Sequence, residues 1–132
     1  MAEVRLAALC DHALVGQDGK VSLIGIFRNI SVSALPAQHP RMYLVAILGL
    51  DPGAHTVTVD LRRPDGGQAM PNPPTISVQA APGQDVNVIV ELNNLNLGSF
   101  GEHNFVVVAD GERLTALPLT VSELPKPQGR RN

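Results

Sequence analysis

The stretch KVSLIGIFRNISVSALP, residues 20–36, decides the fold because it is the longest run in the chain with a single glycine as its only breaker before the closing proline. Its first half is apolar at both parities, which is typical of a strand covered on both faces. In its second half Ile30, Val32 and Ala34 alternate with polar residues, as in a strand with one face in water. We therefore predict one long strand, in which Gly25 permits a bulge, a bend or the close approach of another backbone.

The rest of the chain repeats this pattern, with short apolar stretches between turns that are rich in glycine and proline. The clearest turns, at residues 16–19 and 110–111, predict hairpins. Residues 75–80 lie between prolines and are predicted at a sheet edge, whereas Pro118 places residues 113–121 at an edge or on a bulge. Besides the long strand, we predict strands at residues 4–15, 41–50, 55–63, 75–80, 85–97, 105–109 and 113–121.

Three details of these segments can be tested against a structure. Residues 4–15 are predicted as a strand rather than a short helix, because they lack an apolar stripe with a period of 3.6 residues. Residues 36–40 contain two prolines, which remove ladder donors, and are predicted as a crossing loop. In residues 85–97 the apolar positions change parity near Asn93 and Asn94, which predicts a bulge there.

About eight strands and no convincing helix predict an all-β fold. We expect a two-sheet antiparallel β-sandwich of the immunoglobulin-like or jelly-roll style, with a small closed β-barrel as the alternative. The core should be aliphatic, since the chain has three Phe, one Tyr and no Trp; Phe100 is a candidate for a buried aromatic anchor. The sandwich is expected to span residues 1–122 as a single domain, and the polar residues 123–132 are expected to form a disordered tail.

Charge and cysteine content narrow the classes of partner and compartment. The formal net charge of -2 supplies no basic field for phosphates, which argues against a nucleic-acid partner and, likewise, against a membrane surface. The first fifteen residues lack the basic and apolar segments of an export signal. The single Cys10 has no partner for an intrachain disulfide, which fits a reducing compartment, so we expect a cytoplasmic protein.

Four short motifs resemble a family of uncharacterised bacterial proteins of similar length. They are LCDxA at residues 9–13, GKxxLIGIF at residues 19–27, PxxHP at residues 36–40 and GAH at residues 53–55. The likeness is best in the N-terminal half of the chain, and its most specific part is the second motif. The resemblance implies a small soluble bacterial domain, and it implies no catalytic or binding residue.

Cys10, Asp11 and His12 are neighbours in the sequence and raise the question of a cysteine nucleophile. Neighbouring side chains on a strand point to opposite faces, so Asp11 is not placed to orient His12. Cys10 and His12 share a face but lie about 7 Å apart along a strand, which exceeds the roughly 3 Å needed for proton transfer. We therefore interpret Cys10 as a buried structural residue.

The remaining histidines and carboxylates show no ligand spacing. His39, His55 and His103 fall in or near predicted loops, and a sandwich that gathered these loops at one end would create a metal or pH-sensitive site. The carboxylates fall mostly in turns or on predicted wet faces, and no phosphate-binding glycine motif is present. No residue is therefore assigned a catalytic, cofactor-binding or metal-binding role, and no cofactor is expected.

The sequence thus predicts a non-enzymatic protein-interaction or assembly module. An edge strand, a loop or the proline-rich segment at residues 71–74 would bind a protein partner or a second copy of the chain. The alternative is a small-ligand or metal-binding domain that uses His39, His55 and His103; the sequence does not indicate which small molecule would bind.

Overall fold

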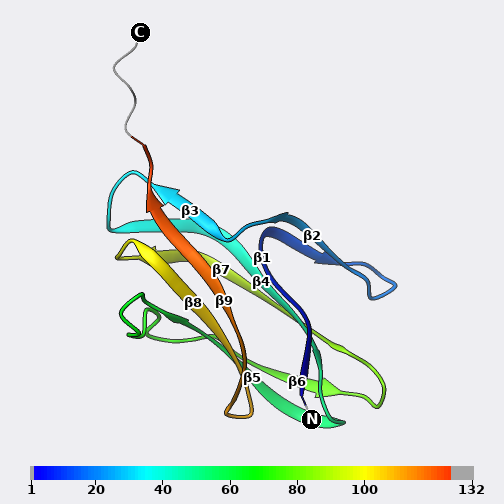
Figure 1. The fold of residues 1–132 in the computed structure, drawn as a ribbon. Helices are drawn as coiled ribbons and strands as arrows, with labels where there is room; N and C mark the ends of the chain where they lie inside the picture. The colour runs from blue at the N-terminus through cyan, green and yellow to red at the C-terminus, as the bar shows by residue number, and fades with distance from the viewer. Residues whose placement is uncertain (1, 126–132) are drawn as a thin grey trace.

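The computed structural model of this chain describes residues 2–125, which form nine strands in two sheets that face each other and curl like half of a barrel (Figure 1). The first sheet has the strand order β2-β1-β4-β7 and is antiparallel. The second has the order β3-β9-β8-β5-β6. The strands are β1 (Glu3–Val15), β2 (Val21–Ile26), β3 (Asn29–Val32), β4 (Ala37–Gly49), β5 (Gly53–Arg62), β6 (Thr75–Ala80), β7 (Val86–Leu97), β8 (Gly101–Ala109) and β9 (Glu112–Glu123).

The main core fills the space between the sheets, where alternate residues of facing strands meet. On β4 the even-numbered residues from Met42 to Leu48 enter this core, and on β8 Phe105 and Val107 do so. All are fully buried aliphatic or aromatic side chains. The predicted all-β, sandwich-like class is therefore confirmed, as is the aliphatic character of the core. Residues 2–125 contain no helix that is long and apolar enough to cross a membrane.

The prediction of a single long strand at residues 20–36 was wrong. The stretch forms two strands in different sheets: β2 pairs with β1, and β3 pairs with β9. Gly25 has a φ of +71°, in the left-handed region that breaks an extended strand. Shortly afterwards the amide of Thr120 donates to the carbonyl of Arg28, which is where the chain joins the second sheet. The extra strand explains why nine are observed where about eight were expected.

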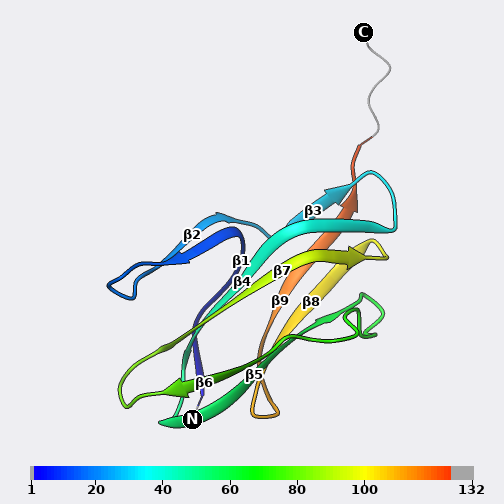
Figure 2. The same ribbon diagram turned by 180° about the vertical axis from the view of Figure 1, so that it is seen from behind.

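The pairing of β3 with β9 is parallel, so the second sheet is mixed rather than purely antiparallel. The chain crosses from the first sheet to the second between β2 and β3. In the second sheet β3 runs alongside β9 in the same direction (Figures 1 and 2). β9 lies between β8 and β3 only at residues 120–123, so the predicted edge position holds for the earlier part of β9, which includes Pro118, and is wrong for Thr120 and Val121. Pro118 precedes that segment and lies opposite Asn104 of β8, so its missing amide breaks no bond to β3.

The predicted loop at residues 36–40 was also wrong, because β4 begins at Ala37 and continues through Pro40. Its partner β7 accommodates the proline: Asn94 has a φ of 52° at the point where His39 pairs with Leu95 and Arg41 with Asn93. The side of β7 that is buried changes at Asn93 and Asn94, as the change of parity predicted. The register between β4 and β7 does not shift there, so the predicted bulge is absent.

Three further predictions concern the edges and ends of the sheets. β6 ends the second sheet, which confirms the edge position predicted for residues 75–80. Phe100 is 39% exposed and is not the predicted buried anchor. At the start of the predicted tail of residues 123–132, which stays a prediction, Glu123 pairs with Val32 and the amide of Leu124 donates to the carbonyl of Val32. Residues 126–132 of that tail lie outside the described residues.

Candidate functional site: the arm and the hollow at its base

The part of the first sheet that differs most from a plain sandwich is the hairpin of residues 10–26, here called the arm. β1 pairs with β4 only as far as Cys10, and from Cys10 to Val15 it pairs with β2 instead. The arm consequently leaves the sheet and extends sideways, as both ribbon views show (Figures 1 and 2). The turn predicted at residues 16–19 closes it, with the amide of Gly19 donating to the carbonyl of Gly16.

One face of the arm covers the outer face of the first sheet. A second apolar cluster forms there around Cys10, Ala13, Tyr43 and Val45, with Val21, Leu23 and Ile89 packed against it. Near the tip, the side-chain amide of Asn87 on β7 lies 3.4 Å from the carbonyl of Gly19 and donates to it. β4 is therefore buried on both faces from Met42 to Ala46.

Cys10 is fully buried in this cluster, which confirms the structural interpretation of the sequence. Desolvation in the cluster raises the pKa of its thiol above the ordinary value. The ring of His12 packs edge-on against Tyr43, with 5.5 Å between the ring centroids. The three adjacent residues that suggested a nucleophile thus serve separate roles: Cys10 packs in the cluster, His12 packs on a ring, and Asp11 faces another surface.

The opposite face of the arm is apolar and open to water. Ile24 and Ile26 of β2 are 55% and 64% exposed, and Leu14 of β1 is 44% exposed. β2 contains no charged residue, and within the described chain its only strand partner is β1. A six-residue strand with an open edge and exposed isoleucines is the kind of feature that soluble proteins usually protect.

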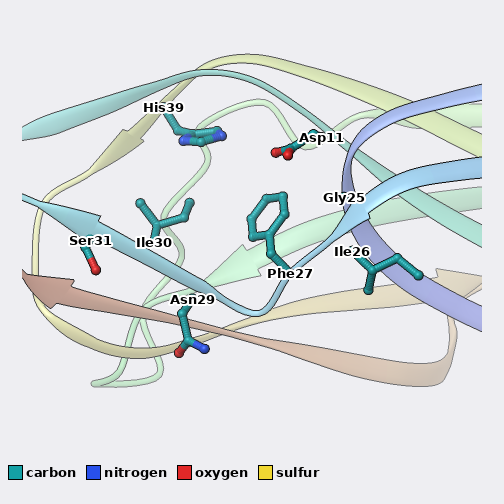
Figure 3. A pocket seen from close by; sticks show the side chains of 8 residues that line it. All are labelled: Asp11, Gly25, Ile26, Phe27, Asn29, Ile30, Ser31 and His39. Carbon is teal, nitrogen blue, oxygen red and sulfur yellow. The ribbon is translucent and has the colours of Figure 1, made fainter.

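At the base of the arm lies a hollow of about 380 Å³ between the two sheets (Figure 3). Four side chains point toward a common space: Asp11 from β1, His39 from β4, and Phe27 and Ile30 from the segment that crosses into β3. The rings of Phe27 and His39 are tilted by 46° with centroids 5.9 Å apart. The hollow is completed by Gly25, Ile26, Asn29 and Ser31.

Gly25 shapes this hollow by its missing side chain. A Cβ atom built at Gly25 would lie 2.4 Å from Oδ2 of Asp11, so only glycine lets the carboxylate lie against the backbone of β2. No described Lys or Arg forms an ion pair with Asp11; the nearest basic residues along the chain have other partners or none. The site therefore combines an exposed carboxylate that has no described cation partner, an imidazole and an aromatic ring.

The three histidines proposed as a site do not come together. His39 lies near the start of β4 and His103 near the start of β8, whereas His55 lies near the start of β5, at the opposite end of the sandwich (Figure 1). His103 is buried with its Nδ1 3.2 Å from the carbonyl of Gly101. In residues 2–125 no three His, Cys, Asp or Glu side chains are grouped so that they could hold a metal ion.

His55 instead joins two turns. Its Nδ1 lies 2.6 Å from Oδ2 of Asp110, and its Nε2 lies 2.6 Å from the carbonyl oxygen of Asp51. Because both neighbours are acceptors, both ring nitrogens must carry protons, and the bonds to Asp110 and Asp51 raise the pKa of His55. The pKa of Asp110 is lowered mainly by the hydrogen bond that its carboxylate accepts from the backbone amide of Thr56, and also by its hydrogen bond with His55.

This arrangement predicts that stability falls in mildly alkaline solution. A raised pKa in the folded state means that the contribution of His55 is fully present below its unfolded pKa of 6.5 and is lost as the pH rises through the folded value. In urea unfolding, the free energy of unfolding should fall as the pH rises above about 6.5, and H55Q should reduce this fall. The exposed-carboxylate control E102Q should leave it unchanged; an unaltered pH dependence in H55Q would contradict the prediction.

Sequence reasoning did not identify the hollow as a site, although a signal for it existed. Asp11 belongs to the LCDxA motif, Gly25, Ile26 and Phe27 belong to GKxxLIGIF, and His39 belongs to PxxHP. Three of the four motifs that carry the resemblance therefore contribute side chains or backbone to one hollow. Their separation in the sequence concealed this, because the crossing from β2 to β3 brings them together.

The chain belongs to a family of unknown function, DUF6941, whose family model matches residues 5–122. This confirms the resemblance to an uncharacterised family. A search of curated proteins found no match.

Two solved structures share the fold at low sequence identity. One is the Pseudomonas fluorescens alkylpurine DNA glycosylase AlkC bound to DNA with an abasic site analog, with a TM-score of 0.50, 13% identity and 91% of this chain covered. The other is a β-glucosidase from Listeria innocua in complex with isofagomine, with a TM-score of 0.50, 11% identity and 92% of this chain covered. The chain spans only 30% and 16% of the lengths of those proteins, and the likeness concerns the fold alone.

Proposed function

We propose that this family member is a non-enzymatic protein-interaction or assembly module, which pairs a strand of another protein molecule with the free edge of β2. The observation that supports this proposal is the uncharged edge of β2, with Ile24 and Ile26 exposed beside it. Pairing along a sheet edge supplies main-chain hydrogen bonds, and the isoleucines would supply apolar contact. No reaction is assigned, since Cys10 is buried and His12 packs against Tyr43.

The other sheet edges carry features that discourage pairing, and β2 lacks them. β6 is bounded by Pro74 and Pro82, and β3 has only four residues. β7 carries the charged Glu91; its left-handed Asn94 does not set it apart, because Gly25 of β2 is left-handed as well. These differences favour β2 as the edge that pairs.

A second copy of the chain is the partner that the composition of β2 favours. β2 carries no charged residue from Val21 to Ile26, so two copies can pair antiparallel along this edge without a like-charge contact in the ladder. Pairing about Leu23 would place Ser22 of each copy opposite Ile24 of the other.

The test places a charge in this edge. The I24K variant should shift the protein from an integer multiple of the 14.0 kDa chain to the monomer, as measured by light scattering after gel filtration. The matched control S77K, on the exposed edge strand β6, should keep the wild-type mass. A wild-type protein that is monomeric at every concentration, or an I24K variant that assembles as the wild type does, would contradict the proposal.

The alternative of a metal or small-ligand site built from His39, His55 and His103 has no observation in its favour. His55 is at the far end of the sandwich, where both of its ring nitrogens already have partners. We do not propose that site.

A further inference from the structure

We propose that the hollow at the base of the arm binds an alkylammonium group, such as the end of a lysine side chain. Ile26 borders both this hollow and the edge of β2, but the inference rests on Asp11, His39 and Phe27, which do not belong to β2, and it stands whether or not two copies pair there. It rests on the charge, the ring and the acceptors that converge in the hollow (Figure 3).

The carboxylate of Asp11 determines that the ligand should carry a positive charge. It points into the hollow, it is held against Gly25, and no described cation pairs with it. An anionic ligand would be repelled, whereas a cation would gain a charge-assisted hydrogen bond. The hollow thus selects a positive group.

The shape of the cation follows from the neighbouring side chains. An ammonium has three donors, and the carboxylate of Asp11 and a ring nitrogen of His39 offer acceptor atoms from two different strands. The face of Phe27 provides an aromatic surface, which attracts cations at distances of up to about 6 Å. Ile30 is buried beside the ring and would contact the methylene stem. A linear amine satisfies all three requirements.

The size of the hollow agrees with such a ligand. At about 380 Å³ it lies in the range of ordinary small-ligand sites, roughly 300 to 1,000 Å³, and it opens to solvent. A side chain that enters from a partner's surface therefore has room to reach Asp11.

The experiment is an NMR titration of the full chain with Nα-acetyl-lysine N-methylamide, with the norleucine derivative as the matched neutral ligand. We expect saturable amide shifts confined to Asp11, His39 and residues 25–31 with the lysine derivative and none with norleucine. D11N should weaken binding roughly tenfold or more, and F27L should weaken it less. The control D18N, which removes an exposed carboxylate from the same arm, should bind as the wild type does.

A titration with n-butylammonium and one with an alanine-rich peptide containing a single lysine distinguish the two sources of the group. Tighter binding of the peptide assigns the hollow to the side chain of a protein partner, and equal affinities assign it to a free amine; both support the chemistry. Equal shifts from the norleucine derivative, unchanged affinity in D11N with intact backbone spectra, or no saturable shift at all would overturn the proposal. I24K, tested in parallel, should bind the lysine derivative normally even where its assembly is lost.

Discussion

Replacing Phe105 with alanine is expected to lower the free energy of unfolding by about 3–5 kcal/mol. Phe105 is fully buried on β8, between Leu61 of β5 and Leu117 of β9 in the register of the second sheet. Truncation would remove the largest apolar side chain of the main core and leave a cavity among rigid neighbours. Since small domains have a total stability of about 5–15 kcal/mol, this loss is a large share of the total.

Urea unfolding monitored by circular dichroism measures this loss, and F100A is the matched control. Phe100 is 39% exposed, and its truncation should cost less than about 1 kcal/mol. Should F105A fail to fold, F105L gives a smaller loss that remains measurable. Similar losses in F105A and F100A would contradict the assignment of Phe105 to the core and Phe100 to the surface.

The second large effect is expected for G25A. A side chain in the left-handed region costs roughly 1–2 kcal/mol, and the contact of the new Cβ with the Asp11 carboxylate adds an overpacking cost of about 1–3 kcal/mol. The loss should appear as a lower midpoint in urea. It should also reduce binding at the hollow, because Asp11 would be displaced.

G19A separates the two contributions to this loss. Gly19 has a φ of +82°, yet a Cβ there would meet no atom within 4 Å, so only the backbone strain applies. The difference in unfolding free energy between G25A and G19A therefore measures the contact with Asp11. Equal losses would show that the carboxylate does not lie against Gly25.

Local patterns predicted the strands well where one strand stays in one sheet. The alternation in β5 and β6 and the Asp110-Gly111 turn needed only neighbouring residues to be interpreted. Residues 20–36 were misinterpreted because apolar residues at both parities resemble a doubly covered strand. In the structure Ile24 and Ile26 are exposed instead, and the chain changes sheets after Gly25.

The candidate site was not predictable for a related reason. Asp11 was considered only as a neighbour of His12, and His39 only as a loop residue, because the sequence places them about thirty residues apart. Their meeting depends on the bend of β1 away from β4 and on the crossing into β3. The bend and the crossing are features of the tertiary structure, so the hydrophobic periodicity of the sequence does not predict them. The position of Pro40 inside β4 was not predictable for the same reason, because it depends on the left-handed Asn94 of the neighbouring strand β7.

The parallel pairing of β3 with β9 has a consequence for synthesis on the ribosome. Asn29 and Thr120 are partners in this ladder, although roughly ninety residues separate them in the sequence. β3 emerges from the exit tunnel long before β9 is translated, so for most of elongation its backbone edge has no strand of its own sheet to join. The second sheet can be completed only after residues 120–123 have been translated and released from the tunnel, so the pairing of β3 is among the last steps in the folding of this domain.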